Sequence, residues 1–292
     1  MSNLSFLDAK FLPLKEAEAV ILPIPYEATI TYGGGTREGP EAILSASRQV
    51  ELWDEEDDWE PAAAIRLATA LPVLPEASGP QVMLDKIRRL VQPWIQQGKL
   101  IAALGGEHTI TTALVQAAQT RYPDLTVVAL DAHADLRDAY DGSKLSHACV
   151  LRRVYELGRP LTLLGTRSYS QEEFQLLRVA PRLKVYPARD LHSPEGWQSA
   201  LDHLQGISGP VYLSIDLDAL DPGIMPGVGT PEPGGLTYYQ ALAVMAALAH
   251  RGPIIGLDLV ELAPIPGQRL SEFTAARLLY KALGYIYRNS RR

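Results

Sequence analysis

The chain of 292 residues lacks several features that mark secreted or membrane proteins. It has one cysteine, Cys149, which cannot form a disulfide within the chain, so we expect a reducing, cytoplasmic setting. The longest apolar stretch, around residues 241–249, is far shorter than the roughly 20 residues that span a bilayer, so we expect no membrane partner. Residues 1–10 lack a basic segment followed by an apolar one, which predicts that there is no signal peptide.

An excess of basic residues is also absent. The chain has 27 Lys and Arg against 34 Asp and Glu, for a formal charge of −7. Because proteins that bind nucleic acids need a basic face for the phosphates, we expect no nucleic-acid partner. A small cationic substrate is compatible with this charge. The hydrophobic fraction of 47% is ordinary for a globular protein, and we expect a single domain, residues 1–292, with its own core.

Short apolar runs alternate with longer amphipathic segments along the chain. The predicted strands are residues 19–23, 64–67, 100–104, 126–131, 161–165, 183–186, 211–216 and 254–258. The predicted helices are residues 39–47, 81–97, 109–121, 147–157, 170–179, 194–205, 238–250 and 271–288. This alternation predicts an α/β fold with three α/β/α layers and a mostly parallel sheet of roughly eight strands. The acidic segment at residues 51–60 is expected to be a solvated loop.

Polar residues follow four of the predicted strands. The segments are Gly-Gly-Glu-His at 105–108, Asp-Ala-His-Ala-Asp at 131–135, Asp-Leu-Asp at 216–218, and Asp-Leu-Val-Glu at 258–261. In open α/β sheets, ligands bind at the carboxyl ends of the strands. Because Asp131, His133 and Asp135 are two residues apart, an extended chain points all three to the same side.

This pattern predicts a metal site, since clustered carboxylates repel one another unless cations neutralise them. The candidate ligands are His108, Asp131, His133, Asp135, Asp216 and Asp218. Their four carboxylates (−4) would balance two divalent cations (+4), and they are too many for one tetrahedral zinc. Oxygen-rich ligation with two imidazoles favours Mn²⁺ over Mg²⁺ or Ca²⁺, although ligand type does not separate Mn²⁺ from zinc or nickel.

Three motifs together carry a resemblance to a known family. They are Gly-Gly-Glu-His-Thr (105–109), Asp-Ala-His-Ala-Asp (131–135) and Ser-Ile-Asp-Leu-Asp-Ala-Leu-Asp-Pro (214–222). With them, the chain resembles the arginase/agmatinase ureohydrolases along nearly its whole length, and most of all the bacterial and archaeal agmatinases. The resemblance implies an arginase-like fold, two Mn²⁺ per chain, and a homo-oligomer, either a trimer or a hexamer.

The resemblance also implies how the ligands are shared. Asp131 and Asp216 would bridge the two metals. His108 and Asp135 would complete one metal, and His133 and Asp218 the other. Glu107 departs from the Asp that many family members have there, and we expect this change to affect the packing around the site more than the metals.

Further residues match functional positions of the family. Two cations that share one water would lower the pKa of that water, and Asp135 would orient the resulting nucleophile. Glu261 would pair with the guanidinium, Thr230 would touch the same group, and His147 would shuttle a proton to the leaving amine. Without the resemblance, His147 would be interpreted as a buried or helix-capping residue. Cys149 is expected to pack within a helix, and His192, His203 and His250 to lie at the surface or in packing contacts.

For the substrate, the sequence favours agmatine, cleaved to putrescine and urea as in polyamine biosynthesis. Arginases that resemble this chain have Asn where Arg137 stands, and residues 138–144 match the agmatinase pattern better. Asp138 and Asp141 would suit an ammonium group, while Arg137 would point into solvent or pair with one of them. The alternatives are N1-aminopropylagmatine, guanidinobutyrate or arginine as substrate.

Two alternatives lie outside the ureohydrolases. A two-metal phosphoesterase also uses clustered Asp and His, but the sequence shows no evident arginine clamp or glycine-rich phosphate cradle. A metal-binding protein without catalysis would need neither His147 nor Glu261 beside the six ligands. The sequence therefore favours a ureohydrolase over both.

Overall fold

The computed structural model describes residues 4–288 and contains an eight-stranded sheet in the order β2-β1-β3-β8-β7-β4-β5-β6. Neighbouring strands are parallel throughout. The strands are β1 (Ala19–Ile24), β2 (Leu67–Thr69), β3 (Leu100–Gly105), β4 (Thr126–Leu130), β5 (Leu161–Leu164), β6 (Leu183–Tyr186), β7 (Val211–Asp216) and β8 (Ile254–Val260). The predicted parallel sheet of about eight strands is confirmed.

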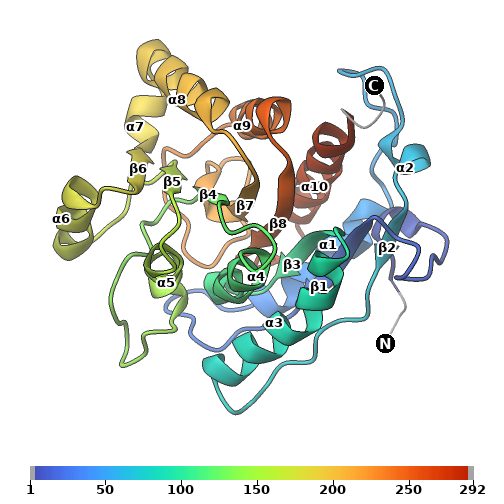
Figure 1. Ribbon diagram of the computed structural model, residues 1–292, viewed down its shortest axis with the longest axis horizontal. Helices are drawn as coiled ribbons and strands as arrows, with labels where there is room; N and C mark the ends of the chain where they lie inside the picture. Colours follow the sequence, from blue (N-terminus) through green and yellow to red (C-terminus); the bar gives the residue numbers. More distant parts are fainter. Residues whose placement is uncertain (1–3, 289–292) are drawn as a thin grey trace.

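Helices cover both faces of this sheet. They are α1 (Gly39–Ser47), α2 (Pro61–Ala64), α3 (Pro80–Gln96), α4 (Thr111–Ala118), α5 (Val150–Glu156), α6 (Gln171–Val179), α7 (Ala188–Leu191), α8 (Pro194–Gly206), α9 (Tyr238–Arg251) and α10 (Leu270–Arg288). Figure 1 shows α8, α9 and α10 on one side of the strands, and α3, α4 and α5 on the other. The predicted three-layer α/β/α architecture is therefore confirmed.

Alternate side chains of each strand enter two different cores. In β1, Ala19 and Ile21 join the core beneath α1, α9 and α10, whereas Val20 and Leu22 join the core beneath α3, α4 and α5. Because both faces are covered, every residue of β1 is buried. This explains why the strands of a parallel sheet are continuous apolar runs rather than alternating patterns.

Some predicted boundaries differ from the structure. The strand predicted at residues 64–67 is wrong at its start, because Pro61 begins the short helix α2 that ends at Ala64. The strand β2 starts at Leu67, where it pairs with Ala19. The helices predicted from 109 and 147 each begin with a 3₁₀ turn, at His108–Ile110 and His147–Cys149. These turns place a histidine at the start of each helix.

The acidic segment at residues 51–60 is not a fully solvated loop, and that prediction is wrong for Asp54 and Trp59, which are buried. The carboxylate of Asp54 accepts a 2.8 Å hydrogen bond from the ammonium of Lys281, a buried residue of α10. Glu56 lies 3.1 Å from the same ammonium and accepts the hydroxyl of Tyr285. The segment packs on α10 because a buried lysine needs carboxylates to offset its desolvation.

We expect Lys281→Met to destabilise the fold by about 3–5 kcal/mol, because it leaves Asp54 buried without its cation. Chemical denaturation followed by circular dichroism measures the difference. The matched control is Arg88→Met, which removes an exposed ion pair with Asp85 and should change stability by less than about 1 kcal/mol. A loss of similar size in both variants would contradict the importance of the buried pair.

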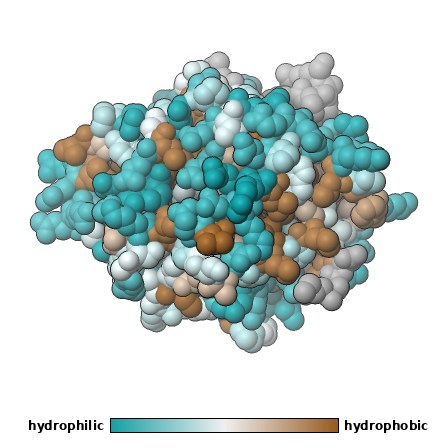
Figure 2. Space-filling view, turned by 60° about the horizontal axis from the view of Figure 1, so that its bottom comes forward, coloured by the Kyte–Doolittle hydropathy of each residue, from teal (hydrophilic) through white to brown (hydrophobic). Residues whose placement is uncertain are grey.

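The surface is mixed in character. Figure 2 shows one face, where hydrophobic residues form separate groups among hydrophilic ones. Some large apolar side chains are well exposed, such as Phe11 and Tyr32, as is common on folded proteins. Within residues 4–288, the helices are all too short or too polar to cross a bilayer.

Candidate metal centre

The sheet order brings the four polar strand ends together. The strands that they follow, β3, β8, β7 and β4, are consecutive neighbours in the sheet. Because all strands are parallel, their carboxyl ends meet at one edge. The sequence predicted each cluster separately, and the topology assembles them into one site.

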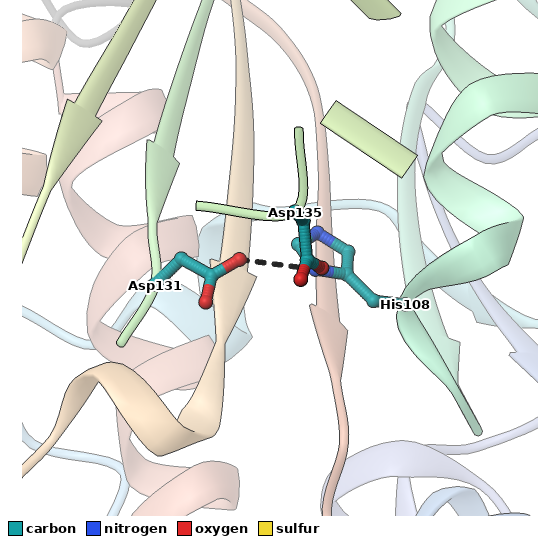
Figure 3. Close-up of side chains that lie close together, drawn as sticks. All are labelled: His108, Asp131 and Asp135. Carbon is teal, nitrogen blue, oxygen red and sulfur yellow. Dashed lines mark ion pairs between the residues drawn. The ribbon is translucent and has the colours of Figure 1, made fainter. Parts of the chain in front are cut away.

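The first group of candidate ligands surrounds the imidazole of His108. Its Nδ1 atom lies 3.3 Å from Asp131 Oδ2, 3.2 Å from Asp135 Oδ2 and 3.2 Å from Asp216 Oδ2. Figure 3 shows the side chains of His108, Asp131 and Asp135 pointing toward one another, His108 from the turn after β3 and both aspartates from the loop after β4. One ligand atom from each of these three lies within 4.8 Å of the others, which is close enough to hold one cation.

The second group lies beside the first. His133 Nδ1 is 2.9 Å from Asp218 Oδ2 and 3.9 Å from Asp131 Oδ1. Asp131, His133 and Asp218 also have ligand atoms within 4.8 Å of one another. Asp131 belongs to both groups, so the arrangement suits two adjacent cations that share this carboxylate.

The buried atoms of the site fit bound cations. Nδ1 of His108 and Oδ2 of Asp131 are buried, and neither makes a hydrogen bond within the described chain. Burial, with the neighbouring Asp135 carboxylate, raises the pKa of Asp131 to about 7. Burial and the Asp218 carboxylate raise the pKa of Asp216 well above its usual range. Bound cations would be coordinated by these atoms, which have no hydrogen-bond partner, and would offset the repulsion between the carboxylates.

A chain of hydroxyl groups fixes which ring nitrogen of His108 faces the site. Its Nε2 atom lies 2.9 Å from Ser214 Oγ, and Ser214 donates to Asp258 Oδ1 at 2.7 Å. Asp258 also accepts hydrogen bonds from Tyr212 and Thr111. His108 Nε2–H therefore donates to Ser214, which leaves Nδ1 as a free lone pair for a metal.

Asp258 thus does not join the metal cluster, although it lies within β8, the strand that Glu261 follows. Sequence analysis did not predict the roles of Ser214 and Asp258. Both lie within or beside the motifs, but alternation along their strands directs their side chains behind His108.

Glu261 and His147 meet beside the first group. Glu261 Oε1 accepts the backbone N–H of His108 at 2.6 Å and lies 3.3 Å from His147 Nδ1. Burial would lower the pKa of His147, but the Glu261 carboxylate outweighs it and raises that pKa to about 9. Glu261 and Asp135 have positive φ values of 66° and 50°, conformations that cost energy for residues other than glycine and occur often at functional sites.

These side chains open into a cavity of about 220 Å³. Its lining includes Thr230, whose hydroxyl donates to Asp218 Oδ2 at 3.3 Å. Arg137 also lines it. Its Nε lies 3.8 Å from Glu173 Oε2, and its guanidinium lies 4.9 Å from the ring centre of Tyr140.

The predicted surroundings of Arg137 therefore need correction. Arg137 faces Glu173 rather than Asp138 or Asp141. Asp138 pairs instead with Arg153 at 2.8 Å and with Lys144 at 3.0 Å. Neither acid is among the residues that line the cavity.

Arg167 is a structural residue of the site that sequence analysis missed. Its guanidinium donates to the carbonyl oxygens of Asp218 at 2.8 Å and Glu232 at 2.7 Å, and to four others nearby, those of Gly165, Ala219, Leu220 and Pro233. It ties the loop after β5 to the loops after β7. A lone arginine after a strand has no spacing pattern that would predict this contact.

The remaining predicted residues lie outside the cavity lining. Cys149 is buried at the start of α5. His203 Nε2 lies 3.0 Å from the Thr162 hydroxyl, His192 Nε2 lies 3.2 Å from the carbonyl oxygen of Gly234, and His250 is exposed. These positions agree with surface and packing roles.

Comparison with known proteins identifies the family. A model of the arginase family matches residues 17–284. The chain belongs to the arginase family. Among similar proteins, the N(1)-aminopropylagmatine ureohydrolase of Synechocystis sp. is 43% identical over 92% of this chain and 89% of its own length. A protein of the same name from Thermus thermophilus is 39% identical over 94% of this chain and 92% of its own.

Other similar proteins carry the name agmatinase. That of Pyrococcus horikoshii is 34% identical over 93% of both chains. Among solved structures, the agmatine ureohydrolase of Thermoplasma volcanium is similar with a TM-score of 0.87 and 30% identity, covering 96% of this chain and 94% of its own. The family and the arginase-like fold predicted from the sequence are both confirmed.

Within this arginase-family site, Asp131 is the ligand candidate shared by both groups. We expect Asp131→Ala to lose most of the bound metal after Mn²⁺ loading, because neither cation keeps its full set of ligands. Elemental analysis of the dialysed protein measures the metal content. The control Asp190→Ala changes an exposed aspartate of α7 and should retain the metals. Two metals retained by Asp131→Ala would contradict the assigned ligands.

Proposed function

We propose that this arginase-family hydrolase cleaves the guanidinium group of N1-aminopropylagmatine, with agmatine as a second substrate, and releases urea. The main support for guanidinium hydrolysis is the presence of two His/Asp groups that share Asp131. The contact between Glu261 and His147 lies beside them. The names of the relatives from Synechocystis and Thermus support the longer substrate over agmatine, which the sequence alone favoured.

The charge of the cavity supports a cationic substrate. Its lining contains the carboxylates of Asp135, Glu173, Asp216, Asp218 and Glu261. Two divalent cations would neutralise the ligands among them. Arg137 faces Glu173 at 3.8 Å, so Glu261 is the carboxylate of this lining left for a cationic substrate. Arg137 is the one arginine in this lining, and it already faces Glu173, so it offers a poor site for the α-carboxylate of arginine. Agmatine and N1-aminopropylagmatine have amine tails without a carboxylate, so they need no such site.

We propose that the site holds two Mn²⁺, with His108 and Asp135 on one, His133 and Asp218 on the other, and Asp131 and Asp216 between them. When bound, such cations supply Lewis-acid chemistry and a nucleophile at neutral pH. In this proposal the chain is one ureohydrolase domain, residues 1–292, that works as a homo-oligomer.

The residues of the chain would position the substrate and move its protons. Oε1 of Glu261 is already engaged by the backbone of His108, which fixes the carboxylate and leaves Oε2 for a guanidinium N–H. Thr230 would contact the same group. Asp135, held at a positive φ, would orient the nucleophile. His147 lies 3.3 Å from the Glu261 carboxylate, which favours the protonated imidazole, so it would protonate the leaving amine.

His147 gives a direct test of this mechanism. We expect His147→Asn to retain both metals and the fold while losing about two to four decades of kcat, as is typical for removal of a general acid. Urea release and metal content are measured on the same preparation. The control His192→Asn changes a histidine at the protein surface and should leave kcat unchanged. An equal loss of metal would instead make His147 a ligand.

The substrate is tested by urea release from a panel of guanidino compounds after Mn²⁺ loading. We expect N1-aminopropylagmatine to rank first in kcat/KM and agmatine second. Arginine and guanidinobutyrate should fall at least about tenfold below the better of these, a difference of about 1.4 kcal/mol, because both carry a carboxylate. Arginine cleaved as well as either amine would contradict the charge argument. Phosphatase activity without urea release would favour the two-metal phosphoesterase.

A further inference from the structure

A loop from the N-terminal part of the chain contacts His147 at two points. The hydroxyl oxygen of Thr29 accepts the backbone N–H of His147 at 2.9 Å. The hydroxyl of Thr31 lies 3.3 Å from Nε2 of the His147 ring. The other ring nitrogen, Nδ1, lies 3.3 Å from Glu261. The imidazole is therefore held from both sides, by Glu261 at one nitrogen and by Thr31 at the other.

Glu107 anchors this loop from within the protein. Its side chain is fully buried, and Oε2 accepts the backbone N–H groups of Ala28 at 2.7 Å and Thr29 at 2.6 Å. Its Oε1 accepts the hydroxyl of Thr29 at 3.0 Å. Because that hydroxyl gives its hydrogen to Glu107, its oxygen can accept the bond from His147. Glu107 is thus linked to His147 through the loop.

A second carboxylate fixes the far end of the loop. Glu27 Oε2 accepts the backbone N–H of Gly35 at 2.7 Å and the hydroxyl of Thr36 at 3.0 Å. Between these anchors, the backbone N–H of Gly33 donates to the carbonyl oxygen of Gly229, next to Thr230. Charge-assisted hydrogen bonds are stronger than neutral ones, so the two carboxylates hold Thr31 in place although it is exposed at the cavity.

We propose that Thr31 is a positioning residue for His147, and that Glu107 holds Thr31 in place through the loop. The proposal rests on the proposed function, in which His147 protonates the leaving amine. The torsion that turns an imidazole ring is broad, so a ring bonded at one nitrogen samples several orientations. Proton transfer requires hydrogen-bond reach, and a partner at Nε2 keeps Nδ1 directed at Glu261 and the substrate.

The test is steady-state kinetics of urea release with Thr31→Val, which removes the hydroxyl and keeps the shape. Because the variant loses one hydrogen bond to His147, we expect kcat to fall about three- to tenfold, while KM and metal content stay at wild-type values. Thr31→Ser, which restores the hydroxyl, should recover kcat. The control Tyr32→Phe removes a hydroxyl from the next, exposed residue and should have no effect.

The deciding measurement repeats Thr31→Val in the His147→Asn protein. If Thr31 acts through His147, no further loss occurs there, since effects of residues that act as a unit are not additive. An equal loss in both backgrounds, or an unchanged kcat in the single variant, would overturn the proposal.

Glu107 is tested by Glu107→Asp, which shortens the side chain by one methylene. It should lower kcat in the wild-type background, retain both metals, and add nothing to His147→Asn. Loss of metal would mean that Glu107 supports the adjacent His108 instead of the loop. A wild-type protein that releases no urea from any compound would overturn the proposed function itself, whereas an active wild type with a normal Thr31→Val variant overturns only the role of Thr31.

Discussion

The repulsion among buried carboxylates is the constraint on which this structure depends. Asp131 and Asp216 are buried among other acids, and without cations their pKa values rise because charge there is unfavourable. Such a cluster persists only because the surrounding fold holds it rigidly and bound cations can neutralise it. The parallel sheet supplies that rigidity, since β3, β8, β7 and β4 each hold one part of the cluster at the same edge.

Around this centre, layers of hydrogen bonds direct the reactive atoms. Asp258 acts through Ser214 to present one nitrogen of His108, and Arg167 ties together the loops that carry Asp218 and Glu232. Glu261 joins the two functions of the site. Its carboxylate holds the backbone of His108 on one side and faces His147 on the other. The proposed proton donor and the proposed metal ligands are therefore positioned by the same residue.

A buried ion pair also stabilises the fold away from the site. Lys281 of α10 meets Asp54 and Glu56, which join a segment near residue 55 to the last helix. Asp54 and Glu56 of the acidic segment therefore have a structural role. A sequence shows an acidic run, but only packing shows that a buried lysine more than 200 residues later faces it.

The sequence by itself determined the order of the strands along the chain, the longer helices, the parallel sheet and the six candidate ligands, because hydrophobic period, capping and residue spacing are local properties. It did not predict the short helices α2 and α7. The family motifs extended the candidate site to His147, Glu261 and Thr230. Tertiary structure decided what depends on contacts between distant segments: the start of β2, the partner of Arg137, the roles of Ser214, Asp258 and Arg167, and the approach of Thr31 to His147, 116 residues along the chain. Local patterns fix the direction in which a side chain leaves its strand, whereas its partner depends on which strands the topology brings together.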